Sequence, residues 1–182
     1  MFARIASLFG RSPDPREAVR PLYDAVVAEA RAPHWYAAGQ VPDTIDGRFE
    51  MVAGLLSLVL LRLERAPETK RESAWLAEVF VTDMDGQLRQ IGIGDVVVGK
   101  HIGKMMAALG GRLRAYRNAL EGRIGLDDVL IRNVWRGERP SDAALEHVAN
   151  QLRRWSDALA ALPTEDIVAA RLPASVPERT SA

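Results

Sequence analysis

The sequence contains no cysteine, and this absence is the first constraint on its function. Without thiols the chain forms no disulfide bonds and has no thiolate nucleophile, which suits a reducing compartment. Lys+Arg and Asp+Glu each number 24, so no global basic field exists to attract nucleic acid. We therefore expect neither a disulfide-stapled secreted protein nor a nucleic-acid-binding protein.

Long apolar runs are lacking as well. No stretch approaches the roughly 20 apolar residues that a membrane-spanning helix needs. The first residues, MFARIASLFGR, lack the long apolar region of a secretory signal. The sequence therefore predicts a cytoplasmic protein.

Signatures of catalysis are scarce. The histidines His34, His101 and His147 are scattered in the sequence and lack a metal-binding spacing such as H-E-x-x-H. Asp83 and Asp85 diverge on a predicted helix and have no third ligand nearby, so a metal site is not expected. No serine lies in a nucleophile-elbow pattern. We predict that the protein is not an enzyme and carries no cofactor.

One nucleotide-binding pattern is almost complete. Residues 94–100 spell G-x-x-x-x-G-K, but His101 follows the lysine where a P-loop has Ser or Thr. A P-loop also needs a preceding strand, and the preceding segment has helical periodicity. The pattern is interpreted as accidental, and a nucleotide-binding enzyme is the least favoured of three hypotheses.

What the sequence does contain is helical periodicity along most of its 182 residues. Apolar residues recur at spacings of three and four, and no convincing alternating strand is present. Met51 to Leu63 is apolar on nearly every side, which is typical of a buried helix. The sequence predicts an all-α, single-domain bundle of about six or seven helices, with a central helix from Arg48 to Arg65.

Three parts are expected along the chain. Residues 1–12 form a short amphipathic segment, in which Phe2, Ile5 and Phe9 are candidate membrane contacts beside flanking arginines. Residues 13–162 form the helical domain, in which Trp35 and Tyr36 are expected to hold the first helix against the next and Ser141 to cap the last helix. Residues 163–182 alternate Pro, Ala, Thr, Glu and Arg, and predict a flexible tail.

The densest mixture of charges and glycines lies between Asp83 and Lys104. Two predicted helices meet there at the Gly92–Gly94 turn, and Asp85 and Arg89 share one helical face, as do Lys100 and Lys104. On the second helix, Gly103, Ala107 and Gly110 predict a neighbouring helix pressed against it, which is usually the other helix of the pair. This profile is typical of a binding or assembly protein rather than of an enzyme.

The sequence also resembles the ubiquinol–cytochrome c chaperone family, from about Leu22 to Ala149. The similarity lies in PDTIDGRFEM at Pro42 to Met51, in DMD at Asp83 to Asp85, and in LRQIGIGDVVVGKHIGKM at Leu88 to Met105. The GGRL segment before Tyr116 and the Arg132-Asn133 pair add to it. One departure is Val97, where the family usually has a small hydroxyl residue.

The resemblance implies an assembly chaperone of the respiratory ubiquinol–cytochrome c reductase. Such a protein binds newly made cytochrome b as its client, at the cytoplasmic face of the inner membrane in a bacterial form. It implies these candidate client-binding residues: Asp46, Arg48, Asp83, Asp85, Arg89, Asp95, Lys100 and Lys104. A helical adaptor with another partner is the alternative that the residues alone leave open.

Overall fold

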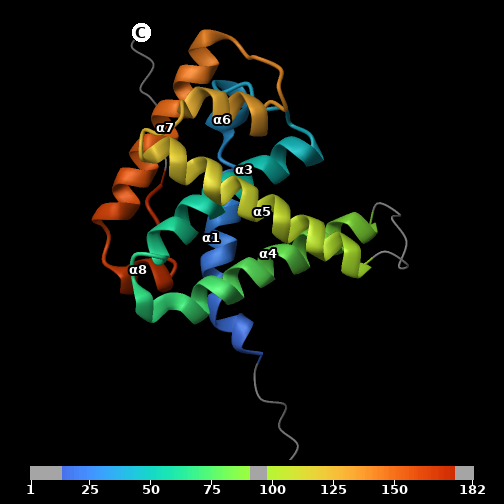
Figure 1. The fold of residues 1–182 in the computed structure, drawn as a ribbon, viewed down its shortest axis with the longest axis vertical. Coiled ribbons are helices and arrows are strands. Elements are labelled where there is room, and N and C mark those ends of the chain that lie inside the picture. Colours follow the sequence, from blue (N-terminus) through green and yellow to red (C-terminus); the bar gives the residue numbers. More distant parts are fainter. Residues whose placement is uncertain (1–13, 91–97, 175–182) are drawn as a thin grey trace, which may run out of the picture.

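The fold is described by a computed structural model that covers residues 14–90 and 98–174, with the backbone alone for residues 87–90 and 98–102. These residues form helices and no strand (Figure 1), which confirms the predicted all-α fold. The α-helices are α1 (Arg20–Ala30), α2 (Pro33–Ala37), α3 (Ile45–Leu63), α4 (Lys70–Gln90), α5 (Val98–Leu120), α6 (Leu126–Asn133), α7 (Asp142–Ala161) and α8 (Thr164–Val168). Two 3-10 helices, η1 (Pro15–Val19) and η2 (Pro67–Thr69), precede α1 and α4.

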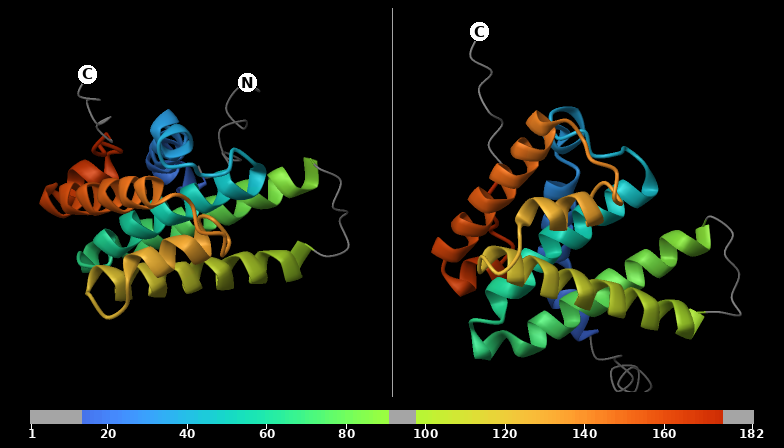
Figure 2. Two further views of the ribbon diagram at one scale, coloured as in Figure 1. Left: turned by 90° about the horizontal axis from the view of Figure 1, so that it is seen from above. Right: turned by 45° about the horizontal axis from the view of Figure 1, so that its top comes forward.

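Helix α3 is the centre of the bundle, as its composition predicts. Figure 2 shows α5 and α6 on one side of α3, and α1 and α7 on the other. From Met51 to Leu60 every residue of α3 is buried, including Ser57, whose hydroxyl donates to the Ala53 carbonyl at 2.6 Å. The helix begins at Ile45, three residues before the predicted start, because Thr44 caps it.

Helices α4 and α5 form an antiparallel pair whose joined ends project from the body (Figures 1 and 2). Leu76, Phe80 and Met84 from α4 and Met105 and Leu109 from α5 are buried, in agreement with the periodicity of the sequence. The Gly92–Gly94 turn between the two helices lies outside the described residues.

The C-terminal part of the bundle is fastened by capping contacts. The Ser141 hydroxyl accepts from the Ala144 N–H at 3.3 Å and begins α7, as predicted. At the other end of α7, the Arg62 guanidinium donates to the carbonyls of Leu159 at 3.1 Å and Leu162 at 2.8 Å. These bonds satisfy carbonyl groups that a helix end leaves without partners.

The folded domain continues beyond residue 162, where the sequence suggested that it ends. Thr164–Val168 form α8, and Ile167 is fully buried. The indole N–H of Trp155 donates to the Pro173 carbonyl at 2.7 Å. The composition of the tail conceals this anchor, because one buried isoleucine and one main-chain acceptor suffice to hold the segment. Residues 1–13, with the candidate membrane contacts Phe2, Ile5 and Phe9, lie outside the described residues.

In the described part of the chain, no helix is both long enough and apolar enough to cross a bilayer.

Candidate functional site

The PDTIDGRFEM segment forms the entry to α3. The Thr44 hydroxyl accepts from the Gly47 N–H at 3.1 Å, which caps the helix. Gly47 lies so close to the preceding turn that an added Cβ atom would be 1.9 Å from the Pro42 carbonyl oxygen. Only glycine fits there, so this part of the segment has a structural reason for its sequence.

Asp46 and Arg48 lie on this first part of α3 and point to solvent. Asp46 forms an ion pair with Arg136, from the connection between α6 and α7, and Arg48 donates to Asp43 at 2.7 Å. The four side chains are more than half exposed, so each pair contributes no more than about 1 kcal/mol to stability. These two candidates therefore pair with residues outside the candidate set.

Asp83 has a structural partner. The Tyr23 hydroxyl donates to its carboxylate at 2.7 Å, which ties α1 to α4. Burial, and then the bond to Asp83, raises the pKa of the Tyr23 hydroxyl far above its usual range. Tyr23 is therefore a permanent donor at physiological pH, and Asp83 has a defined role in packing.

The remaining candidate client-binding residues belong to α4, α5 and the connection between them, and the structure describes only some of them. Asp85 is half-buried on α4, and Lys104 is exposed on α5. The side chains of Arg89 and Lys100, and all of Asp95, lie outside the described residues. The element before the G-x-x-x-x-G-K pattern is a helix, α4, and not the strand that a P-loop requires.

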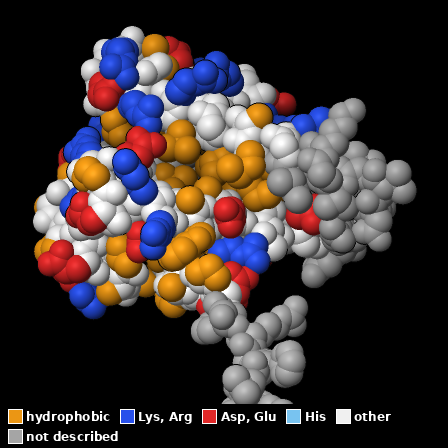
Figure 3. Space-filling view, turned by 60° about the horizontal axis from the view of Figure 1, so that its bottom comes forward, with side chains coloured by type: hydrophobic (Ala, Val, Ile, Leu, Met, Phe, Trp, Pro, Cys, Tyr) orange, Lys and Arg blue, Asp and Glu red, His pale blue; other side chains and the backbone are white. Residues whose placement is uncertain are grey.

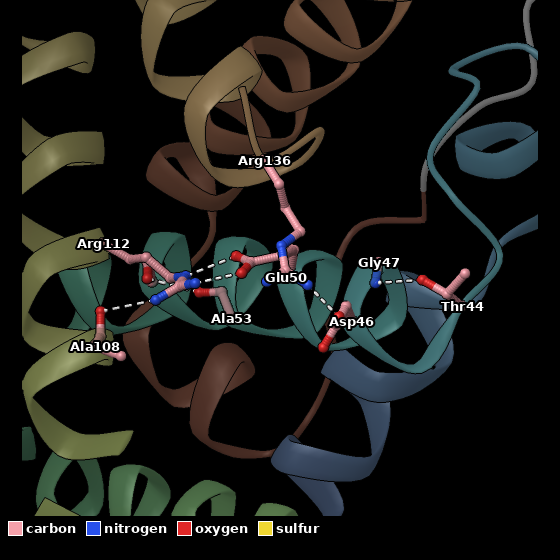
Figure 4. A network of polar contacts seen from close by, with 9 residues as sticks. Thr44, Asp46, Gly47, Glu50, Ala53, Ala108, Arg112 and Arg136 are labelled. Carbon is pink, nitrogen blue, oxygen red and sulfur yellow. Dashed lines mark hydrogen bonds and ion pairs between the residues drawn. The ribbon is translucent and has the colours of Figure 1, made fainter. Parts of the chain in front are cut away.

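A buried ion pair between α3 and α5 was not identified from the sequence. Glu50 accepts from Arg112 through both of its carboxylate oxygens, at 2.7 Å from Nε and at a shorter distance from Nη2 (Figure 4). The Arg112 Nη1 also donates to the Ala108 carbonyl at 3.1 Å, and the guanidinium lies 5.2 Å from the centre of the Phe49 ring. The side chains of Arg112 and Glu50 are only 15% and 10% exposed. The signal in the sequence was Glu50 itself. It is an acidic residue next to an apolar run, and a buried carboxylate requires a partner.

Tyr116 packs next to this pair. It is 1% exposed, and burial raises the pKa of its hydroxyl, with a smaller contribution from the Glu50 carboxylate. A Cβ atom at Gly54 would lie 2.9 Å from the Tyr116 hydroxyl. Gly54 therefore allows α3 and α5 to approach closely where the ion pair joins them.

The small-residue stripe of α5 is open. Gly103, Ala107 and Gly110 are exposed, and no atom of the described residues lies within 4 Å of a Cβ atom added at Gly103 or Gly110. The prediction that the other helix of the pair covers this stripe is therefore wrong for the described residues, because α5 turns its opposite side toward α4 and α3. Met106, on the same open side, is 43% exposed.

Two histidines that are far apart in the sequence lie together in the structure. Nδ1 of His34, on α2, is 3.0 Å from Nε2 of His147, on α7. The spacing of the histidines in the sequence does not indicate this pair, because 113 residues separate the two and only the fold joins them. Among the described residues, no group of three or more His, Cys, Asp or Glu could hold a metal ion. Trp35 and Tyr36 fasten α2 to the end of α1, as predicted, by donating to the carbonyls of Glu29 and Ala30.

This pair predicts a loss of stability in mild acid. Burial, and then the electrostatic influence of the neighbouring His147, lowers the pKa of His34 from 6.5 to about 4. Between these values the unfolded chain takes up a proton that the folded chain excludes, so the free energy of unfolding falls as the pH falls. Because His34 is only partly buried and solvent screens its electrostatics, urea unfolding should give a value lower by no more than about 1 kcal/mol at pH 5 than at pH 7 from this group. The variant His34→Gln should lose that part of the pH dependence, and an unchanged pH profile would contradict the assignment.

Comparisons with known proteins find one matching family and a similar solved structure. The family model described as "Ubiquinol-cytochrome C chaperone" matches residues 37–174. The crystal structure of the Cbp3 homolog from Brucella abortus is similar, with a TM-score of 0.77 and 30% sequence identity. The similarity covers 88% of this chain and 90% of that one. No curated protein matches the chain.

Proposed function

Because the chain belongs to the ubiquinol–cytochrome c chaperone family, we propose that it binds newly made cytochrome b and supports assembly of the ubiquinol–cytochrome c reductase. The single observation that carries the site is the open side of α5, formed by Gly103, Met106, Ala107 and Gly110. We call these residues the α5 open face. Its occupant is an apolar helical segment of the client.

The chemistry of the α5 open face suits such an occupant. Small side chains let the backbone of a second helix approach closely, which is how apolar helices pack in membranes. The flexible thioether of Met106 adapts to apolar partners of different shape. Figure 3 shows hydrophobic side chains gathered between charged groups on one side of the molecule.

In the proposal, charged residues of the α4–α5 pair contribute to client binding. Lys104 is exposed on α5 and Asp85 is half-buried on α4, whereas Asp95 and the side chains of Arg89 and Lys100 lie outside the described residues and are candidates from the sequence alone. Opposite charges across an interface speed association and select the partner. Asp46 and Arg48, on α3, would contribute at a separate surface. The protein would act at the cytoplasmic face of the inner membrane, where a membrane-protein client is made.

A complementation experiment tests this function. A deletion strain should lose b-type cytochrome absorbance and reductase activity, and the wild-type gene should restore both. The variant Ala107→Glu should fail to restore them, because a carboxylate buried against an apolar client helix costs several kcal/mol.

The matched control is Ala74→Glu, which places the same charge on an exposed position of α4. Both variants should fold, with free energies of unfolding within about 0.5 kcal/mol of wild type. A deletion strain with full reductase activity would contradict the function. Equal complementation by the two variants would contradict the α5 open face as the client site.

A further inference from the structure

A second surface feature, between α5 and α6, has a different chemistry from the α5 open face. It is a pocket of about 470 Å³, and its polar lining consists of Arg112, Arg114, Asn118, Arg132 and Asn133. None of its described lining residues is an Asp or a Glu. The pocket therefore gathers three guanidinium groups without an acid among them.

The net charge of this pocket is positive. Glu50, which approaches Arg112 from α3, neutralises one of the three guanidinium groups. Arg114 and Arg132 are exposed, and neither forms an ion pair with another described residue. Two positive charges thus remain at the wall of one pocket, where like charges repel unless an anion lies between them.

The polar atoms offered to a ligand are mainly donors. Arg112 uses three of its N–H groups for Glu50 and Ala108, and a guanidinium has five. The Asn118 carbonyl oxygen Oδ1 accepts from Arg123 Nε at 3.0 Å, which leaves the amide N–H groups of Asn118 for other partners. The Nδ2 of Asn133 is buried and has no acceptor among the described residues. A donor in this state costs stability until an acceptor reaches it.

From these observations we propose that the pocket between α5 and α6 binds a phosphate group. A phosphate carries a charge of about −1.5 to −2 at pH 7 and three or more acceptor oxygens. It therefore matches two uncompensated arginines and several amide donors better than a carboxylate, which has one charge and two oxygens. Forked guanidinium groups bind such oxygens in pairs. The phosphate is either a free phosphate monoester or the headgroup of an anionic lipid.

Two variants distinguish phosphate binding in this pocket from a general attraction of anions to positive charge. Arg114→Gln with Arg132→Gln removes the two uncompensated charges. Gly111→Leu keeps every charge but fills the pocket, since Gly111 lines it and no described atom lies within 4 Å of an added Cβ atom there. The control, Arg71→Gln with Arg153→Gln, removes the same charge from exposed positions on α4 and α7.

Calorimetric titration of the purified protein with inorganic phosphate and with glycerol 3-phosphate tests whether the ligand is a free phosphate compound. Flotation with phosphatidylcholine vesicles, with and without phosphatidic acid, tests whether it is the headgroup of an anionic lipid. Saturable binding is expected in at least one arm, weakened about tenfold or more by each pocket variant and by less than about twofold in the control. Binding in the titration alone identifies a small phosphate ligand, and binding in the flotation alone identifies a lipid headgroup.

The proposal is overturned if neither arm shows binding by the wild-type protein. It is also overturned if the pocket variants bind as the control does. Neither readout involves cytochrome b or reductase assembly, so this result is independent of the proposed function.

Discussion

Replacing Glu50 or Arg112 with alanine should lower the free energy of unfolding by about 3–5 kcal/mol, because each change leaves the other charge buried without its partner. The pair joins α3 to α5 through two hydrogen bonds to the carboxylate, and both side chains are largely buried. Urea unfolding at pH 7 measures the loss. The double variant Glu50→Leu with Arg112→Met should recover most of it, since an apolar pair of similar size avoids the cost of burying charge.

The matched control is the exposed ion pair between Asp46 and Arg136, which begins on the same helix. Alanine at either position should cost less than about 1 kcal/mol. If Glu50→Ala lowers the free energy of unfolding by no more than Asp46→Ala does, the buried ion pair does not hold α3 against α5.

Gly47→Ala should destabilise the protein by about 2–4 kcal/mol, because the methyl group would overlap the Pro42 carbonyl and displace the Thr44 cap. The added Cβ atom would lie 1.9 Å from a backbone oxygen, which cannot rotate away as a side chain can. Thermal and urea unfolding measure the loss. The circular dichroism of the folded state should still be helical.

The same substitution at Gly110 provides a control of opposite sign. In the part of the chain that the structure describes, nothing lies within 4 Å of a Cβ atom there, and the residue is inside α5. Gly110→Ala should therefore stabilise the protein by about 0.5–1 kcal/mol through helix propensity alone. Equal effects at the two positions would contradict the close approach of Gly47 to Pro42.

The parts of the fold that depend on local spacing could be predicted from the sequence. The all-α class, the central position of α3 and the Ser141 cap follow from residues three or four apart, which interact within one helix. The start of α3 was misplaced because Thr44 stands among other polar residues that are also common caps.

Contacts between distant residues could not be predicted in this way. Glu50 and Arg112 are 62 residues apart, and His34 and His147 are 113 apart. Nothing in the periodicity of one helix says which residue of another will face it. The small-residue stripe of α5 shows the same limit: its pattern indicates a surface that permits close approach, but not whether this chain or a partner occupies it.

The most direct test of the account is photo-crosslinking in cells that are making new cytochrome b. A photoreactive amino acid at position 107, on the α5 open face, should give a covalent adduct with newly made cytochrome b. The same amino acid at position 74, on the exposed side of α4, should give little or none. An absence of the adduct at position 107, or equal adducts from both positions, would contradict the proposal that the α5 open face binds this client.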